Sequence, residues 1–372
     1  MPASVPRRIA FRCDASLQIG TGHVMRCLTL ADHLRQLGTE CIFLGRPHIG
    51  NLLELARRRN HIALTLPMRR PVAAVAQKDP VHLPWLGATW EEDANDCIVA
   101  LRRYLGDECL DWLVVDHYGL DARWESRMRR ICPSLIAIDD LADRPHNCSI
   151  LVDQNLGRKL ADYNNLVPHG AQMLIGPHFA MLRPEFARLR STSLARRSEP
   201  EFKRLLITMG GVDNDNATGR IIKALDQVSL PADIAITVVL GPNAPWLEQV
   251  RYQAANMRRS IEVKSGVDNM AQLMCDSDFS IGAAGSTSWE RCCLGLPCIT
   301  LVVAENQNEI ASALERLGVV VLAQSANAIG EILVQCLHSR DSRTGLRDLG
   351  LRAAELCDGG GVDRIVAYLK DG

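Results

Sequence analysis

The sequence predicts an α/β protein built from two doubly wound, Rossmann-like domains. Short apolar strands alternate with amphipathic helices along the chain, a pattern typical of parallel sheets with helices on both faces. At 372 residues the chain exceeds one typical hydrophobic core, so two domains are expected. Charge and polarity rise over 188–203, which divides the chain into a domain at 1–187, a linker at 188–203 and a domain at 204–372. We expect the two domains to face each other across a cleft, with ligands at the carboxyl ends of the strands.

The expected elements follow from apolar runs bounded by turn residues. In the first half, strands are predicted at 8–13, 40–44, 112–116, 134–138 and 149–152. A helix near 90–104 opens with Thr89 and Glu92 in capping-box spacing, and 66–87 reads as an extended excursion across the surface. In the second half, strands are predicted at 204–209, 234–240, 260–264, 278–282, 298–303 and 319–322. The C-terminal stretch 341–370 is predicted to be helical, interrupted at 359–361.

Composition excludes several classes of protein. With 47% apolar and 23% charged residues, the chain has the composition of an ordinary soluble globular protein. A formal net charge of −1 gives no electrostatic case for nucleic acid or an anionic membrane, and no apolar run approaches the roughly 20 residues of a membrane span. The thirteen cysteines form no Cys-x-x-Cys pair, so we read them as buried side chains of a protein in a reducing compartment, the cytoplasm.

The most informative segment joins the first strand to a helix predicted at 24–37. Gly20 and Gly22 let the backbone approach a ligand, and the helix N-terminus offers unpaired N–H groups to an anion. His23, expected to be neutral at this helix end, could act as a general base. A dinucleotide fingerprint fails, since Met25 stands where it needs a third glycine. The alternative is that His23 only caps the helix or packs as a ring.

Two further loops lie between a strand and a helix in the second half. In one, Gly285, Ser286 and Thr287 could hold a diphosphate, while Glu290, one turn on, could accept both hydroxyls of a ribose. In the other, which includes Gly210, Gly211 and Asn216, the backbone could close over the same pyrophosphate. The alternatives are a simple strand–turn–helix junction with Glu290 as a surface acid, and a turn in which Asp215 or Asn216 caps the helix.

Acidic residues also end several strands of the first half. Asp116-His117-Tyr118-Gly119 closes an apolar strand, and Asp139-Asp140 and Asp153-Gln154-Asn155 end the next two. Paired carboxylates could bind Mg²⁺, but capping and loop hydrogen bonds are commoner uses, so we expect no metal and no cofactor.

Several blocks, in order along nearly the whole chain, resemble one family. They are 12–27, 85–94, 115–119, 139–144, 153–155 and 182–186. Together they are similar to the UDP-2,4-diacetamido-2,4,6-trideoxy-beta-L-altropyranose hydrolases of pseudaminic acid biosynthesis. The second half also resembles the glycosyltransferase that forms lipid II in peptidoglycan synthesis. This wider kinship implies a GT-B-like architecture with UDP in the cleft.

The resemblance implies an enzyme that uses water to break the anomeric C–O bond of a UDP-linked diacetamido trideoxy sugar, with inversion. It assigns the catalytic base to His23, and inversion requires the phosphate loop at Ser286 and Thr287 to face that base. By analogy Glu290 would hold the ribose, and the remaining substrate contacts would come from Tyr118, Asn306 and Gln307. Our own suggestion is that Asp14 orients the His23 ring. Phe179 stands where the family would have a tyrosine, which removes a hydroxyl but keeps the packing.

Because helix N-termini can neutralise a departing diphosphate, we expect activity without a metal. Three other functions stay open: a glycosyltransferase with a sugar or lipid acceptor, a sugar-nucleotide epimerase, and a non-catalytic sugar-nucleotide-binding regulator. The partner expected in every case is a UDP-sugar, a small molecule. The sequence is silent on the exact sugar stereochemistry and on the oligomeric state.

Overall fold

The computed structural model describes residues 5–69, 79–199, 201–338 and 342–369. The chain divides into two compact units. Unit 1 consists of Met1–Met181 together with Gly361–Gly372, and unit 2 of Leu182–Gly360. Each unit contains one fully parallel sheet, as the alternation of strands and helices predicted.

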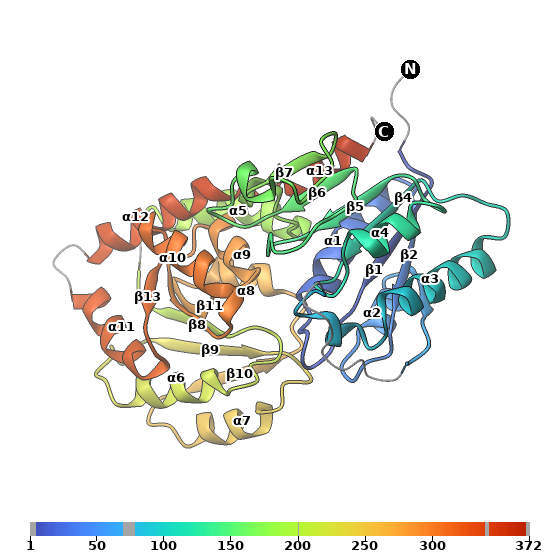
Figure 1. The fold of residues 1–372 in the computed structure, drawn as a ribbon. Helices are drawn as coiled ribbons and strands as arrows, with labels where there is room; N and C mark the ends of the chain where they lie inside the picture. Colours follow the sequence, from blue (N-terminus) through green and yellow to red (C-terminus); the bar gives the residue numbers. More distant parts are fainter. Residues whose placement is uncertain (1–4, 70–78, 200, 339–341, 370–372) are drawn as a thin grey trace. The chain divides into compact units, whose positions relative to one another are not determined.

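The sheet of unit 1 has seven strands in the order β3-β2-β1-β4-β5-β6-β7 (Figure 1). The strands are β1 (Arg8–Cys13), β2 (Glu40–Gly45), β3 (Ile62–Thr65), β4 (Trp112–Asp116), β5 (Leu135–Ile138), β6 (Ile150–Asp153) and β7 (Gln172–Ile175). The strand order reverses between β1 and β4, which pair in parallel, with Ile9 opposite Trp112. In open parallel sheets this reversal leaves a crevice at the carboxyl ends of the two strands.

Helices cover both faces of this sheet. Alternate β1 side chains enter two separate cores, Phe11 on one face and Ala10 on the other. The Phe11 core contains residues of α1 (Gly22–Gln36), α2 (Leu53–Arg58) and α13 (Gly361–Leu369), and the Ala10 core contains residues of α3 (Trp90–Leu105) and α4 (Ala122–Met128). The predicted capping box of α3 is confirmed: Thr89 Oγ1 accepts from the Glu92 N–H, and a Glu92 carboxylate oxygen accepts from the Thr89 N–H.

The sheet of unit 2 has six strands in the order β10-β9-β8-β11-β12-β13 and reverses between β8 and β11. The strands are β8 (Arg204–Thr208), β9 (Ala235–Leu240), β10 (Ile261–Ser265), β11 (Phe279–Ala283), β12 (Cys298–Leu301) and β13 (Val321–Ala323). Helices α6 (Ala217–Asp226), α7 (Leu247–Ala255) and α11 (Ile329–His338) contribute to one core. The others are α5 (Pro184–Arg196), α8 (Met270–Asp276), α9 (Thr287–Cys293), α10 (Asn308–Arg316) and α12 (Ser342–Leu356), of which α12 adds Leu346 to the same core and α9 packs against α5 and α12.

The predicted linker is wrong. Residues 188–196 lie in α5, and the described residues that follow lead to β8 within unit 2. Their basic side chains do not mark a solvated linker, because three arginines donate to backbone carbonyls within the unit. Arg190 bonds the carbonyls of Cys293, Ala354 and Cys357, while Arg196 and Arg197 both bond that of Ser277. The division falls earlier, between Met181 and Leu182.

The C-terminal boundary is also different from the prediction. Residues 361–372 return to unit 1 instead of ending the second domain. The buried side chains of α13, Val362, Ile365, Val366 and Leu369, pack in the same core as α1. Gly361 begins this helix where a Cβ would clash with the Ala180 carbonyl oxygen, so the start of α13 lies directly against the 177–180 turn.

All eleven predicted strands are present, with ends that shift by one or two residues. Two edge strands, β3 and β7, were missed; most of their side chains are only partly buried or exposed, so their apolar pattern is weak. Part of the predicted excursion at 66–87 is a short turn, η1 (Leu83–Leu86), with Leu83 and Leu86 buried, and 70–78 lie outside the described residues. Among the helices that the structure describes, none is both long and apolar enough to cross a membrane.

Candidate active site

The residues singled out in the sequence follow the strands at which each sheet reverses. In unit 1, His23 lies after β1 and Tyr118 after β4. In unit 2, the 209–217 loop follows β8 and the 284–290 segment follows β11. These are the positions where parallel α/β sheets bind ligands, so each unit presents its predicted loops at one functional edge.

His23 is held by a carboxylate at the end of the neighbouring strand. Its Nδ1 lies 2.6 Å from Asp116 Oδ1, and both side chains are almost fully buried. Burial alone would raise the pKa of Asp116, but Arg26 and His23 outweigh it and hold that pKa well below its usual range. Asp116 is therefore ionised and only accepts hydrogen bonds, so the proton of a neutral His23 ring sits on Nδ1. Nε2 is then the basic atom.

Arg26 fixes Asp116 in turn. Its Nε and Nη2 donate to the two carboxylate oxygens of Asp116 at 2.6 and 2.7 Å, and its Nη1 donates to Asp140 Oδ2 at 2.9 Å. His23 and Arg26 stand three residues apart on α1, hence on one helical face. The sequence reasoning missed both partners, although Asp116 closes a predicted strand and Arg26 has this spacing.

An aromatic cluster lies on one side of the His23 ring. Tyr118 meets it edge-on, with ring centroids 4.5 Å apart. His82 and Trp85, from the η1 turn, lie 5.2 and 5.9 Å from the Tyr118 ring. The structure therefore brings the predicted Tyr118 to His23 and adds two rings that the sequence reasoning did not single out.

Asp14 does not orient His23, contrary to our suggestion. Its Oδ2 lies 2.8 Å from Arg12 Nη1, and its Oδ1 accepts from the Arg46 N–H at 2.8 Å. The reason is strand alternation: Cys13 packs in the α1 core, so the next residue turns toward the opposite face, where Arg12 bonds Asp93 of α3. Burial would raise the pKa of Asp14, but Arg12 and its other neighbours hold it well below its usual range.

The N-terminus of α1 is open in the way that anion binding requires. Gly20 has φ +82°, and its N–H donates to the Ser16 carbonyl at 2.9 Å, which closes the turn before the helix. Thr21 occupies the N-cap without a side-chain capping bond, and no acidic residue lies in the first turn, which Gly22 and His23 begin. The positive end of this helix thus has no negative partner on its own first turn.

In unit 2, the segment after β11 has the predicted form. Ser286 is the N-cap of α9 but makes no capping bond. Glu290, one turn on, has its carboxylate 3.9 Å from Arg183, and burial raises its pKa against the opposing effect of Arg183. The Gln307 side chain also lies near this segment. Its Nε2 would be 3.8 Å from a Cβ placed on Gly285.

The second loop of unit 2 shows the capping alternative directly. Asn216 is the N-cap of α6, and its Oδ1 accepts from the Gly219 N–H at 3.0 Å. Asp213 accepts from the N–H groups of Ala217 and Thr218, at 2.8 and 2.9 Å. The backbone N–H groups in the first turn of α6 are thus already hydrogen-bonded to side chains of the loop itself. The part of this loop left to bind a ligand is the backbone of its glycines. Gly210 has φ +94°, and the neighbouring Gly211 packs against Gly241.

Two predicted contacts remain to be placed. Asn306 lies in the short η4 turn (Glu305–Gln307) that follows β12. Gln307 Oε1 accepts from the Val303 N–H at 3.1 Å, which anchors this turn to the end of the strand. Phe179 packs, partly buried, against the α1 core of unit 1, so the predicted packing role is confirmed.

The acidic strand ends of unit 1 are occupied by protein partners. Asp139 pairs with Arg144 at 2.8 Å and accepts from the Ala142 N–H, while Asp153 pairs with Arg158 at 3.1 Å. The Ala142 contact is the loop hydrogen bonding that was the alternative to Mg²⁺, and the ion pairs are a further use of these carboxylates. Over the described ranges, no group of three or more His, Cys, Asp or Glu side chains is arranged to hold a metal ion.

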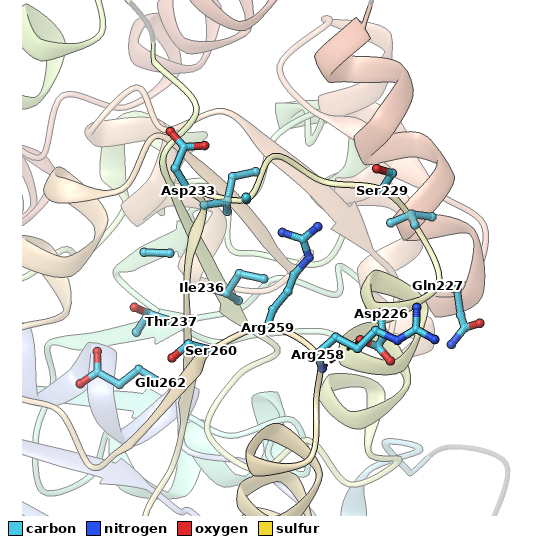
Figure 2. A pocket seen from close by; sticks show the side chains of 14 residues that line it. Asp226, Gln227, Ser229, Asp233, Ile236, Thr237, Arg258, Arg259, Ser260 and Glu262 are labelled. Carbon is cyan, nitrogen blue, oxygen red and sulfur yellow. Dashed lines mark hydrogen bonds between the residues drawn. The ribbon is translucent and has the colours of Figure 1, made fainter.

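A large open pocket of about 840 Å³ lies elsewhere in unit 2 (Figure 2). Its lining includes Ile236 at the start of β9 and Ser260 before β10, so it sits at the amino ends of these strands. Arg259, which lines it, donates to the carbonyls of Leu230 and Pro231. Because parallel sheets bind ligands at the opposite edge, we do not place the substrate here.

Comparison with known proteins agrees with this picture. No family model matches the chain. It is 25% identical over 306 residues to an uncharacterized protein of Methanocaldococcus jannaschii, covering 81% of this chain but only 57% of that relative. It is also 25% identical over 311 residues to the UDP-2,4-diacetamido-2,4,6-trideoxy-beta-L-altropyranose hydrolase of Campylobacter jejuni, covering 84% of this chain and 97% of the relative. The resemblance found in the sequence is thereby confirmed.

A solved structure decides the fold. The crystal structure of MurG from Acinetobacter baumannii matches with a TM-score of 0.65 at 13% identity, covering 99% of this chain and 100% of that one. The fold is GT-B-like. A shorter sequence match is to the Helicobacter pylori UDP-N-acetylglucosamine–N-acetylmuramyl-(pentapeptide) pyrophosphoryl-undecaprenol N-acetylglucosamine transferase. The two chains are 31% identical over 124 residues, which cover 32% of this chain and 34% of the relative. The GT-B-like fold agrees with the predicted class of two doubly wound domains.

Proposed function

We propose that this protein is an enzyme that acts on a UDP-linked sugar. Specifically, it would hydrolyse UDP-2,4-diacetamido-2,4,6-trideoxy-beta-L-altropyranose to UDP and the free sugar with inversion, in pseudaminic acid biosynthesis. The single observation that carries the proposal is the His23–Asp116 pair. It leaves Nε2 of a nearly buried imidazole as the basic atom at the functional edge of unit 1. The similarity to the Campylobacter hydrolase over most of both chains supports the choice of substrate.

In this mechanism His23 Nε2 takes a proton from water as the water oxygen bonds to the anomeric carbon. The bond from that carbon to the diphosphate oxygen breaks, and its electron pair leaves with UDP. Attack opposite the leaving group inverts the anomeric centre. Asp116, held by Arg26, stabilises the imidazolium that forms, and such a base typically contributes about 10²- to 10⁴-fold in rate.

Unit 2 would bind the UDP. The diphosphate would contact the uncapped start of α9 at Ser286 and Thr287. It would also contact the backbone of Gly210, Gly211 and Gly285. Glu290, with a loose ion pair to Arg183, would accept the ribose hydroxyls. The sugar contacts that the family resemblance predicts are Asn306 and Gln307 in unit 2 and Tyr118 in unit 1. Gly20 and Gly22 are predicted to contact the substrate at the start of α1.

The test is to incubate purified protein with the UDP-sugar and follow UDP and free sugar by NMR, alongside His23→Ala. We expect inverted free sugar from the wild type and none above background from the variant. His33→Ala is the matched control, since His33 lies on the same helix and pairs instead with Asp363. Wild-type turnover that survives His23→Ala would reject His23 as the base, and a wild type that leaves the UDP-sugar intact would reject the hydrolase.

A glycosyltransferase is the second candidate, because the Helicobacter match is to a transferase. The same NMR experiment separates the two. A transferase would release UDP only after an acceptor is added and would yield a glycoside instead of free sugar.

A further inference from the structure

A buried arginine lies beneath the predicted phosphate segment of unit 2. Arg291, on α9, is only 2% exposed. Its Nη2 donates to the Ala283 carbonyl at 2.7 Å and to Ser288 Oγ at 3.0 Å, and its Nη1 donates to Thr287 Oγ1 at 3.2 Å. All three partners are neutral, and they belong to the end of β11 and the first turn of the helix.

In the described part of the chain, no carboxylate lies within ion-pair distance of Arg291, although its positive charge opposes the burial that raises the pKa of the neighbouring Glu290. Removing a guanidinium from water is costly unless an anion or a full set of hydrogen bonds compensates. Two buried arginines of unit 1 have such an anion in direct contact, as Arg12 has Asp93 and Arg26 has Asp116. Arg291 is a buried cation that no carboxylate contacts directly.

The fold makes room for this guanidinium at one specific point. A Cβ on Gly282 would clash with Arg291 Nη1 and would lie 3.2 Å from the Thr208 carbonyl oxygen. Gly282 pairs with Thr208 across β11 and β8, the two strands at which the sheet reverses. The charge thus lies beside the ends of β11 and β8, the strands that lead into the two loops predicted to hold the diphosphate.

We propose that Arg291 is a positioning residue for the nucleoside diphosphate, which it attracts by its buried positive charge while it orients the Thr287 and Ser288 hydroxyls. This inference rests on the proposed function, because it assumes that unit 2 binds UDP. The leaving diphosphate would supply a compensating anion, and the arginine would offset the charge that develops when the C–O bond breaks.

The test compares UDP with uridine, which lacks the phosphates, by calorimetric titration of the full-length protein. We expect Arg291→Gln, which removes the charge, to weaken UDP binding by about ten- to a hundredfold and to leave uridine binding unchanged. Arg291→Lys, which keeps a charge, should restore most of the UDP affinity. The Arg291→Gln variant should also lose part of the dependence of UDP affinity on salt.

Arg197 provides the matched control. It is also a buried arginine of unit 2 that bonds only neutral partners, the carbonyls of Ser193, Met274 and Ser277 and the Ser193 hydroxyl. Arg197→Gln should lower thermal stability and leave the ratio of UDP to uridine affinity unchanged.

The outcomes separate the two proposals. If the wild type does not bind UDP, the proposed function fails and takes this inference with it. If the wild type binds UDP but Arg291→Gln binds UDP and uridine as the wild type does, only the inference is overturned. The same holds if Arg291→Gln and Arg291→Lys lose UDP and uridine affinity equally, since that is the result of a purely structural arginine.

Discussion

Asp116 Oδ1 lies 2.6 Å from His23 Nδ1, and the two residues are 93 positions apart in the sequence. Parallel pairing of β1 with β4 brings them together, because the two strands end side by side with Cys13 opposite Asp116. The histidine in the first turn of α1 is thereby oriented, with a defined tautomer. The predictions below test this pair and the features that surround it.

Asp116→Asn should lower kcat by about 10²- to 10⁴-fold, with a small change in KM. The amide can donate to Nδ1, which would favour the tautomer with its proton on Nε2 and so remove the basic atom. The measurement is steady-state release of UDP from the UDP-sugar. Asp363→Asn is the control, since Asp363 also pairs with an α1 histidine, His33, but is largely exposed. Equal rates for Asp116→Asn and the wild type would rule out a role for Asp116.

Glu290→Gln should reduce the preference for ribose over deoxyribose. If Glu290 accepts the ribose hydroxyls, the wild type should bind UDP about tenfold or more tightly than 2′-deoxy-UDP, and the variant should bind the two alike. Titration with both nucleotides measures the ratio. Glu248→Gln, on an exposed side chain of α7, should leave the ratio as it is. A wild type that does not discriminate between the nucleotides contradicts the assignment.

Gly241→Ala should weaken UDP binding by about tenfold, because the new Cβ would clash with the Gly211 carbonyl oxygen and displace the glycine loop. Gly345→Ala is the control in the same unit, since a Cβ there meets nothing within 4 Å. Both variants are measured by UDP titration after circular dichroism has shown them to be folded. If Gly241→Ala binds UDP as tightly as the wild type, Gly210 and Gly211 do not contribute to UDP binding.

His146 should make stability depend on pH. Burial alone would lower the pKa of His146, but Glu125, at 2.7 Å, and Asp139 outweigh it and raise this pKa to about 9. A raised histidine pKa stabilises the fold fully below the unfolded value of about 6.5, and this stabilisation is lost as pH rises through 9. The loss is about 3 kcal/mol at most.

The measurement is the free energy of unfolding of unit 1 at about pH 6 and about pH 9, in the wild type and in His146→Gln. The variant should be less stable at the lower pH and should lose less stability between the two. A variant whose stability falls with pH as steeply as that of the wild type would show that His146 is not the group that titrates.

Ile365→Ala should destabilise unit 1 by about 2–5 kcal/mol, because Ile365 is fully buried in the α1 core. Tyr368→Ala, at a position that is 39% exposed on the same helix, should change stability by about 0.5 kcal/mol or less. Hydrogen exchange reports which unit loosens. Faster exchange in β8 and β11 but not in β1 would contradict the return of α13 to unit 1.

The sequence by itself determined the class of the fold and the strands after which most candidate site residues lie. Apolar runs and turn residues predicted eleven strands, and the loops after β1, β8 and β11 were recognised from local glycine, serine and histidine patterns. These are local signals, since a strand end and a helix start are set by neighbouring residues.

Only the tertiary structure decided which distant side chains meet. Strand alternation turned Asp14 away from His23, and the β1–β4 pairing supplied Asp116 instead. The arginines of α5 were polar in the sequence but bond carbonyls inside unit 2, and α13 crosses back to the first core. Partners across a sheet or between cores are chosen by packing and burial of the whole unit, and no local window of residues contains that information.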